Sequence, residues 1–153
     1  MSATFVRDAK VDDLACILAI ERATAEAPHW SEEAWRDAVV GPSWRRVVWV
    51  AERDSEVCGF IVLSRTMDLA ELESMAVEQR IRRQGVARLL LLCAQQWARA
   101  QKLGAIELEV RAANEGAQAL YRATGFEEQG RRKEYYRDPD EDAVLMAWAM
   151  KVS

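Results

Sequence analysis

The chain has 153 residues, half of them hydrophobic and 30% charged, a composition that predicts one folded domain over residues 1–153. Its formal net charge of −4 does not favour direct binding to nucleic acid or to an anionic membrane. No apolar run approaches the roughly 20 residues that span a bilayer, and the first eight residues lack the pattern of a signal peptide, so we expect a cytoplasmic protein.

Few residues of the chain could build a metal or disulfide site. Cys16, Cys58 and Cys93 are widely spaced and odd in number, which argues against a disulfide framework. No CxxC pair is present, and His29 is the single histidine. We therefore expect no metal site, and a Ser-His-Asp hydrolase is disfavoured.

The first part of the chain predicts a strand and two helices. Residues 4–7 are typical of a strand, and apolar residues recur at helical spacing from Leu14 to Ile20, in a helix that begins near Val11. Ser31 is a typical N-cap of a second helix, which ends before Gly41-Pro42.

The middle part predicts three strands and the longest helix. Residues 47–51 and 57–63 form strands that a polar loop joins as a hairpin, and residues 69–77 form the next strand. Apolar residues then recur at helical spacing from Gly85 to about Leu103, before Gly104.

The last part predicts a strand over 105–111, a helix over 114–124 with Asn114 as its cap, and strands over 126–136 and 143–151. The strand–helix–strand run from 69 to 111 implies a parallel strand pair with a crossover helix. We therefore expect an α/β fold, with a mixed, mostly antiparallel sheet, a central parallel strand pair and helices on both faces.

A basic turn precedes the longest helix, where residues 82–88 read RRQGVAR. A helix N-terminus carries free N–H groups and the positive end of the helix dipole, so Arg82, Arg83 and Arg88 are unfavourable there unless an anion binds. Gly85 and Ala87 would let a phosphate approach the backbone. The alternative is a solvated turn in which the glycine serves only the bend. The spacing fits neither a Rossmann nor a P-loop motif.

Residues 82–87 resemble the motif Q/R-x-x-G-x-G/A of the GNAT superfamily of acetyl-CoA-dependent N-acetyltransferases. In that family the loop and helix N-terminus bind the pyrophosphate of acetyl-CoA, and the preceding strand pairs with the pantetheine arm. The resemblance extends over essentially the whole chain and implies the GNAT fold, with acetyl-CoA as co-substrate and no metal.

A second block, I-E-L-E-V-R-A-A-N followed by A-L-Y-R-A-T-G-F, is similar to the pattern of the ribosomal-protein-alanine N-acetyltransferases (RimI type). In that family the residue aligned with Glu109 is the general base and the one aligned with Tyr121 is the general acid. Glu109 could instead pair with a neighbouring arginine, and Glu71 and Glu73 are rival bases. The residues that the two motifs assign to the cofactor are Met75, Ala76, Val77, Arg82, Arg83, Gln84, Gly85, Val86, Ala87 and Asn114.

Acyl transfer to an amine needs those two roles. The nucleophile must be neutral, and an α-amine, with a pKa of about 7.7–8.0, loses its proton far more readily near neutral pH than a lysine at about 10.4. A carboxylate can accept that proton, and a tyrosine hydroxyl can protonate the leaving thiolate. A covalent route through a cysteine lacks a nearby histidine, so we expect the three cysteines to pack.

The acceptor side is predicted from two further stretches. A-P-H-W-S-E resembles the family's P-W-S stretch, and R-K-E-Y-Y resembles its R-R-N-Y-Y segment, with Glu134 in place of the usual Asn. Glu73 would add negative charge that attracts a cationic peptide N-terminus. The predicted substrate-binding residues are Trp30, Glu73, Tyr135 and Tyr136.

Three functional hypotheses follow. The first is acetylation of the N-terminal alanine of a small-subunit ribosomal protein, by direct transfer, in a monomer or weak dimer. The second is a GNAT enzyme for other protein N-termini, lysine or a small amine. The third is a non-catalytic acetyl-CoA-binding module that regulates a partner.

Overall fold

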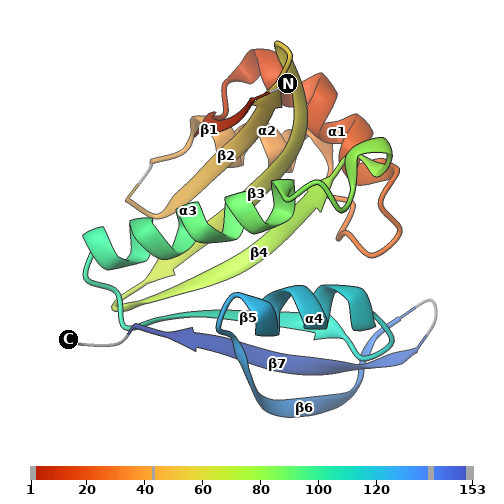
Figure 1. Cartoon of the computed structure of the whole chain (residues 1–153), viewed down its shortest axis with the longest axis vertical. Helices are drawn as coiled ribbons and strands as arrows, with labels where there is room; N and C mark the ends of the chain where they lie inside the picture. Colours follow the sequence, from red (N-terminus) through yellow and green to blue (C-terminus); the bar gives the residue numbers. More distant parts are fainter. Residues whose placement is uncertain (1–2, 43, 138–139, 151–153) are drawn as a thin grey trace.

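Within residues 3–42, 44–137 and 140–150, which the computed structural model describes, seven strands form one sheet in the order β1-β2-β3-β4-β5-β7-β6 (Figure 1). Helices cover both of its faces. The elements are β1 (Thr4–Asp8), a 3-10 turn (Val11–Asp13), α1 (Leu14–Arg22), α2 (Glu32–Val40), β2 (Arg46–Arg53), β3 (Glu56–Thr66), β4 (Leu69–Val77), a second 3-10 turn (Gln79–Ile81), α3 (Val86–Ala100), β5 (Ala105–Arg111), α4 (Glu115–Ala123), β6 (Glu127–Tyr136) and β7 (Glu141–Ala149).

The pairing of the strands confirms the predicted mixed sheet. β4 and β5 are parallel, with α3 as the crossover between them, and the other neighbouring strands are antiparallel. The predicted end of the last strand at residue 151 lies outside the described residues.

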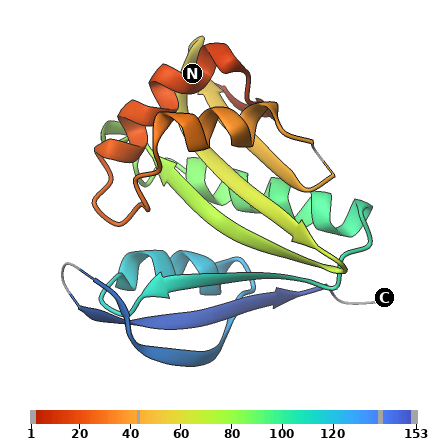
Figure 2. The same ribbon diagram turned by 180° about the vertical axis from the view of Figure 1, so that it is seen from behind.

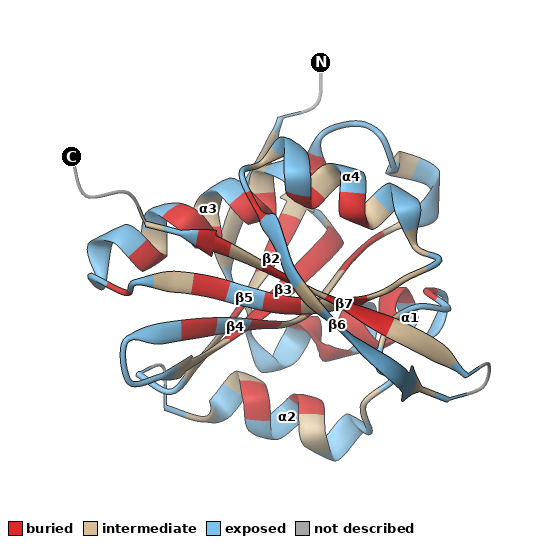
Figure 3. Cartoon of the chain, turned by 90° about the horizontal axis from the view of Figure 1, so that it is seen from below, coloured by how far each residue is buried: buried red, intermediate tan, exposed pale blue. Residues whose placement is uncertain are grey.

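The sheet has an apolar core on each face. α3 and α4 pack on one face, where Leu90, Ala94 and Phe126 are buried (Figure 1). α1 and α2 pack on the other, over β2, β3 and β4, and leave β5, β7 and β6 uncovered on that side (Figure 2). Figure 3 shows buried residues on the sheet-facing sides of the helices, whereas β6 is exposed along most of its length.

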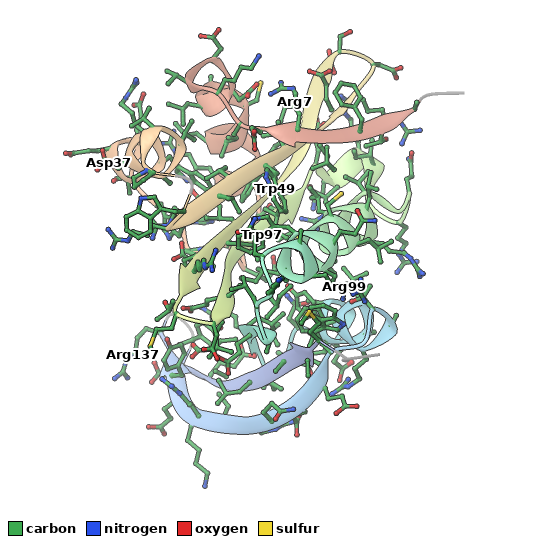
Figure 4. All side chains as sticks on the ribbon, turned by 90° about the vertical axis from the view of Figure 1, so that its left-hand side faces the viewer. Arg7, Asp37, Trp49, Trp97, Arg99 and Arg137 are labelled. Carbon is green, nitrogen blue, oxygen red and sulfur yellow. The ribbon has the colours of Figure 1, made fainter. Side chains whose placement is uncertain are left out.

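An aromatic contact holds the longest helix on the sheet. Trp49 on β2 and Trp97 on α3 meet edge to face, with ring centroids 5.9 Å apart and an interplanar angle of 84° (Figure 4). This geometry is the one that aromatic pairs prefer. The contact between Trp49 and Trp97 therefore helps to hold α3 against β2.

Local signals account for most helix ends. Ser31 Oγ accepts a hydrogen bond from the Ala34 amide at 3.1 Å, and Asn114 Oδ1 accepts one from Ala117 at 3.2 Å, so both predicted N-caps are confirmed. α3 ends at Ala100 rather than near residue 103, because the chain turns where Lys102 adopts a φ of 59°.

β4 contains a bulge that separates it from β5. Ser74 pairs with Val62 and Leu72 with Leu63, so Glu73 is one extra residue on β4. A bulge bends its strand and increases the local twist. The parallel ladder ends just before it, at the pair Glu71 and Glu107, and the two strands then diverge (Figure 1).

A buried carboxylate joins α1 to α2. Glu21 is fully buried, and its Oε1 accepts a hydrogen bond from Trp35 Nε1 at 2.8 Å. Its Oε2 has no hydrogen-bond partner among the described residues. Burying a polar group costs free energy unless it is hydrogen-bonded, so this bond offsets part of the cost of burying Glu21.

Replacing Trp35 with Phe removes that bond and keeps most of the ring. We expect the free energy of unfolding, measured with urea, to fall by about 2–4 kcal/mol, because the buried carboxylate then has no partner. The double variant Glu21→Met/Trp35→Phe removes both polar groups and is expected to be more stable than Trp35→Phe alone. A double variant no more stable than the single one contradicts this explanation.

Candidate active site

A cleft of about 860 Å³ opens where β4 and β5 diverge. Its walls come from β4, the turn before α3, the end of β5, α4 and the loop between α1 and α2. Sequence positions that are far apart therefore meet at one place. The predicted site residues that line the cleft are Glu73, Met75, Ala76, Val77, Arg82, Arg83, Gly85, Val86, Ala87, Glu109, Asn114, Tyr121 and Tyr136.

One end of the cleft is a helix N-terminus rich in arginine. The first hydrogen bond within α3 runs from the Leu89 amide to the Gly85 carbonyl at 3.0 Å, so the amides before Leu89 have no acceptor inside the helix. Gly85 has a φ of 83°, and a Cβ there would meet no atom within 4 Å. Glycine thus serves the left-handed conformation and leaves the approach to the amides open.

The arginines at this end have different surroundings. Arg82 donates from Nε to the Val77 carbonyl at 3.4 Å, which ties the turn to the end of β4. Arg83 takes a φ of 68° and lines the cleft, as does Arg88, which stood in the predicted anion turn. Together with the helix dipole, these cations favour an anionic group.

Gln84 does not line the cleft. Its Oε1 accepts a hydrogen bond from Arg53 Nη1 at 2.6 Å, so it connects the turn to the β2–β3 hairpin. The side chain of Gln84 therefore contacts the hairpin and not the cleft.

The end of β4 offers an open strand edge. Met75, Ala76 and Val77 pair with β3 on one side only, because the ladder to β5 stops at Glu71. An extended ligand with amide groups can pair with such an edge. The arginine-rich N-terminus of α3 fits a diphosphate, and the open edge of β4 beyond its ladder with β5 fits an amide-containing arm.

Tyr121 lies on α4 and is 8% exposed. Burial raises the pKa of Tyr121 to about 12, so its hydroxyl keeps its proton at neutral pH. Its ring packs against Phe126, with centroids 5.7 Å apart. A buried, protonated hydroxyl at a cleft wall is suited to donate a proton.

Glu109 projects from β5 on the face that α1 and α2 leave uncovered, since Leu108 and Val110 belong to the opposite core. Arg132 Nη1 lies 3.8 Å from its Oε1. A hydrogen bond from Tyr135 to the Glu109 carboxylate is the main cause of a raised pKa of Tyr135. Arg111, a neighbouring arginine in the sequence, pairs with Glu141, with its Nη1 3.4 Å from Oε1.

β6 departs from its ladder next to Tyr135. Arg132 pairs with Ala143 and Tyr136 with Glu141, so three residues of β6 lie opposite one of β7. Glu134, in this irregular segment, has a φ of 50°, a conformation that Asn adopts more easily than Glu. Tyr135 does not itself line the cleft.

Carboxylates gather at the seam of β4 and β5. Burial, followed by the charges of Glu73, Glu109 and Glu107, raises the pKa of Glu71. Glu73 Oε1 is bound by Arg46 Nη2 at 3.0 Å. This end of the cleft is therefore acidic and opposes the arginine end.

Asn114 and Tyr136 have structural partners at the cleft. The side-chain oxygen of Asn114 caps α4 and leaves its amide nitrogen for other contacts. Burial, with the charge of Glu109, raises the pKa of Tyr136 to about 12. The guanidinium of Arg111 stacks 4.5 Å from the Tyr136 ring centroid.

Trp30 lies behind the cleft rather than on its wall. Arg46 stacks over its ring at 5.7 Å, and Trp30 in turn packs on Trp35 with ring centroids 4.8 Å apart. It supports the arginine that holds Glu73. In its place the neighbouring loop residues Thr24, Glu26, Ala27 and Pro28 line the cleft.

The sequence motifs gave no role to the other lining residues. The bulge that orients Ser74 depends on strand register, and the apolar or small lining residues are common in any core or helix. The further lining residues are Leu72, Ser74, Ile81, Val110, Arg111, Gly116, Ala117 and Leu120.

Two other kinds of site find no support in the part of the chain that the structure describes. No group of three or more His, Cys, Asp or Glu side chains there is arranged to hold a metal ion. None of its helices has both the length and the apolar character needed to cross a bilayer.

The chain resembles proteins of one known family. A sequence model of the acetyltransferase (GNAT) family matches residues 15–126. The [ribosomal protein bS18]-alanine N-acetyltransferase of Escherichia coli (strain K12) is 32% identical over 125 residues, which cover 80% of this chain and 82% of that protein. A putative enzyme of the same name from Bacillus subtilis (strain 168) is 28% identical over 141 residues, 92% of each chain.

Solved structures of known proteins share this fold. The crystal structure of the ribosomal-protein-S18-alanine N-acetyltransferase from Escherichia coli matches with a TM-score of 0.85 and 28% sequence identity, over 99% of this chain and 96% of that one. The chain therefore belongs to the acetyltransferase (GNAT) family and is an N-acetyltransferase.

Proposed function

We propose that this chain, as a single domain, transfers the acetyl group of acetyl-CoA to the terminal α-amine of a peptide, and that the acceptor is the N-terminal alanine of a ribosomal protein. The observation that carries the proposal is one cleft lined by the arginine-rich N-terminus of α3, by Glu109 and by Tyr121. The names of the Escherichia coli and Bacillus subtilis relatives support the choice of acceptor.

Acetyl-CoA would be held at the basic end of the cleft. The α3 amides, with Arg82, Arg83 and Arg88, would bind its diphosphate, and the open edge of β4 from Met75 to Val77 would pair with its amide-containing arm. Bound there, it supplies an activated acetyl thioester.

Two side chains would move protons. Near neutral pH only about 1 pKa unit opposes deprotonation of an α-amine, and Glu109, on the acidic side, would accept the released proton directly or through a water. Tyr121 would donate its hydroxyl proton to the departing sulfur. Its pKa of about 12 keeps that proton available at neutral pH.

The acceptor would lie across the uncovered face of β5. The seam of carboxylates that includes Glu71, Glu73 and Glu109 would attract a cationic N-terminus and steer it into the cleft. The openness of this face, where neither α1 nor α2 extends, favours an extended peptide over a small amine (Figure 2).

The acceptor class is tested by turnover of acetyl-CoA with two hexapeptides. One begins with Ala-Arg and has a free N-terminus, and the other has a blocked N-terminus and an internal lysine. We expect kcat/KM to be at least about 100-fold higher for the peptide with the free N-terminus. The reason is that the pKa of a lysine side chain is over 2 units above that of an α-amine, so far less of it is in the neutral, nucleophilic form. Preference for the blocked lysine peptide contradicts the acceptor assignment, and tight acetyl-CoA binding without turnover of either favours a regulatory module.

Replacing Tyr121 with Phe removes the proposed acid. We expect kcat to fall by about 10²–10⁴-fold with little change in acetyl-CoA affinity, because the thiolate would leave unprotonated. Tyr136→Phe is the matched control, since that tyrosine lines the same cleft and has a similarly raised pKa. It should affect the KM for peptide more than kcat, and the reverse pattern would move the acid role to Tyr136.

Replacing Glu109 with Gln keeps the side chain's shape and removes the proposed base. We expect kcat at saturating peptide to fall by about 10²–10⁴-fold. Glu71→Gln and Glu73→Gln provide the comparison, and both should keep kcat within a few-fold. A large loss of kcat in either of them, with Glu109→Gln active, would place the base on β4.

A further inference from the structure

Two polar atoms on adjacent residues of β4 are buried without hydrogen-bond partners in the described structure. They are Ser74 Oγ and Glu73 Oε2. Ser74 is only 4% exposed, and both residues line the cleft. Because an unpaired buried polar group costs free energy, such atoms at a binding site indicate a ligand that completes their hydrogen bonds.

The β4 bulge decides where these atoms point. Since Glu73 is the extra residue, Ser74 pairs with Val62 and lies on the same face as Val62 and Ala76, which belong to the core under α1 and α2. Glu109 projects from β5 on that face too. Ser74 is thus on the acceptor side of the cleft.

The carboxylate of Glu73 is fixed by a neighbour. Arg46 Nη2 binds its Oε1 at 3.0 Å, and the side chain of Glu73 is 17% exposed. Arg46 is itself supported from below by the ring of Trp30, at 5.7 Å. This contact engages one carboxylate oxygen, and Glu73 Oε2 and Arg46 Nε are both buried without a hydrogen-bond partner in the described structure. Arg46 therefore acts as a positioning residue.

The chemistry of the two atoms selects the ligand. A carboxylate oxygen only accepts hydrogen bonds, and a serine hydroxyl can accept one as well, so a group with several N–H donors completes both. A primary ammonium has three donors and a positive charge that Glu73 would stabilise.

We propose that Ser74 Oγ and Glu73 Oε2 form the subsite that binds the terminal ammonium of the acceptor before Glu109 deprotonates it. This inference rests on the proposed function and adds Ser74 as a substrate-binding residue.

Calorimetry with coenzyme A-saturated protein tests the subsite through two peptides of one sequence, with a free and with an acetylated N-terminus. Ser74→Ala should weaken binding of the free peptide about fivefold and Glu73→Gln about tenfold or more, because each loses one bond to the ammonium. Binding of the acetylated peptide should change less than about twofold in both, since it has no ammonium.

Glu52→Gln is the matched control. Glu52 is paired with Arg7 at 3.1 Å and its side chain is 21% exposed, much like the pair of Glu73 and Arg46, but it does not line the cleft. It should leave the affinity for both peptides unchanged. In thermal unfolding Ser74→Ala should be at least as stable as the wild type, because it removes an unpaired buried hydroxyl.

The outcomes separate this subsite from the proposed function. Equal weakening of both peptides, or no weakening in either Ser74→Ala or Glu73→Gln, overturns the subsite and leaves the proposed function in place. Wild-type protein that binds acetyl-CoA but not the free peptide overturns the proposed function and the subsite with it.

Discussion

The divergence of β4 and β5 is the constraint on which the rest of this structure depends. Their parallel ladder has three pairs and ends at Glu71 and Glu107, immediately before the bulge at Glu73. The bulge turns the strand while β3 continues to pair with it, so β4 keeps its place in the sheet and gains an open edge. Without this divergence the cleft would be filled by a continuous ladder, and the α3 N-terminus would face a closed sheet.

The cleft has opposite electrostatic ends, and this polarity suits the two reactants of an acetyl transfer. Arg82, Arg83 and Arg88 add to the positive end of α3, whereas carboxylates gather at the β4–β5 seam, where burial and then the charges of Glu73, Glu109 and Glu107 raise the pKa of Glu71. An anionic carrier and a cationic amine are thus each attracted to their own end, and each is disfavoured at the other. Tyr121 lines the same cleft, where burial keeps it protonated.

A continuous set of contacts connects the core beneath α1 and α2 to the acceptor side. Glu21 binds Trp35, which packs on Trp30, which supports Arg46, which holds Glu73. In this chain of contacts Arg46 and Glu73 stand between the cleft and Trp30, the tryptophan predicted to touch substrate. Such support restricts the rotamers of Glu73, which matters because an acceptor site must hold its groups in a narrow range of positions.

The sequence by itself determined the elements, the parallel pair and the basic turn, because caps, periodicity and the length of the 69–111 crossover are local properties. It also predicted that Glu109, Tyr121 and Gly85 belong to one site, through motifs whose spacing is local, and the structure places all three on one cleft. Only the tertiary structure decided that Gln84 binds Arg53 and lies off the cleft, that Trp30 supports Arg46, and that Ser74 shares a sheet face with Val62 and Ala76. Those outcomes depend on strand register and on contacts between distant segments, and a one-residue bulge reverses which face a side chain occupies.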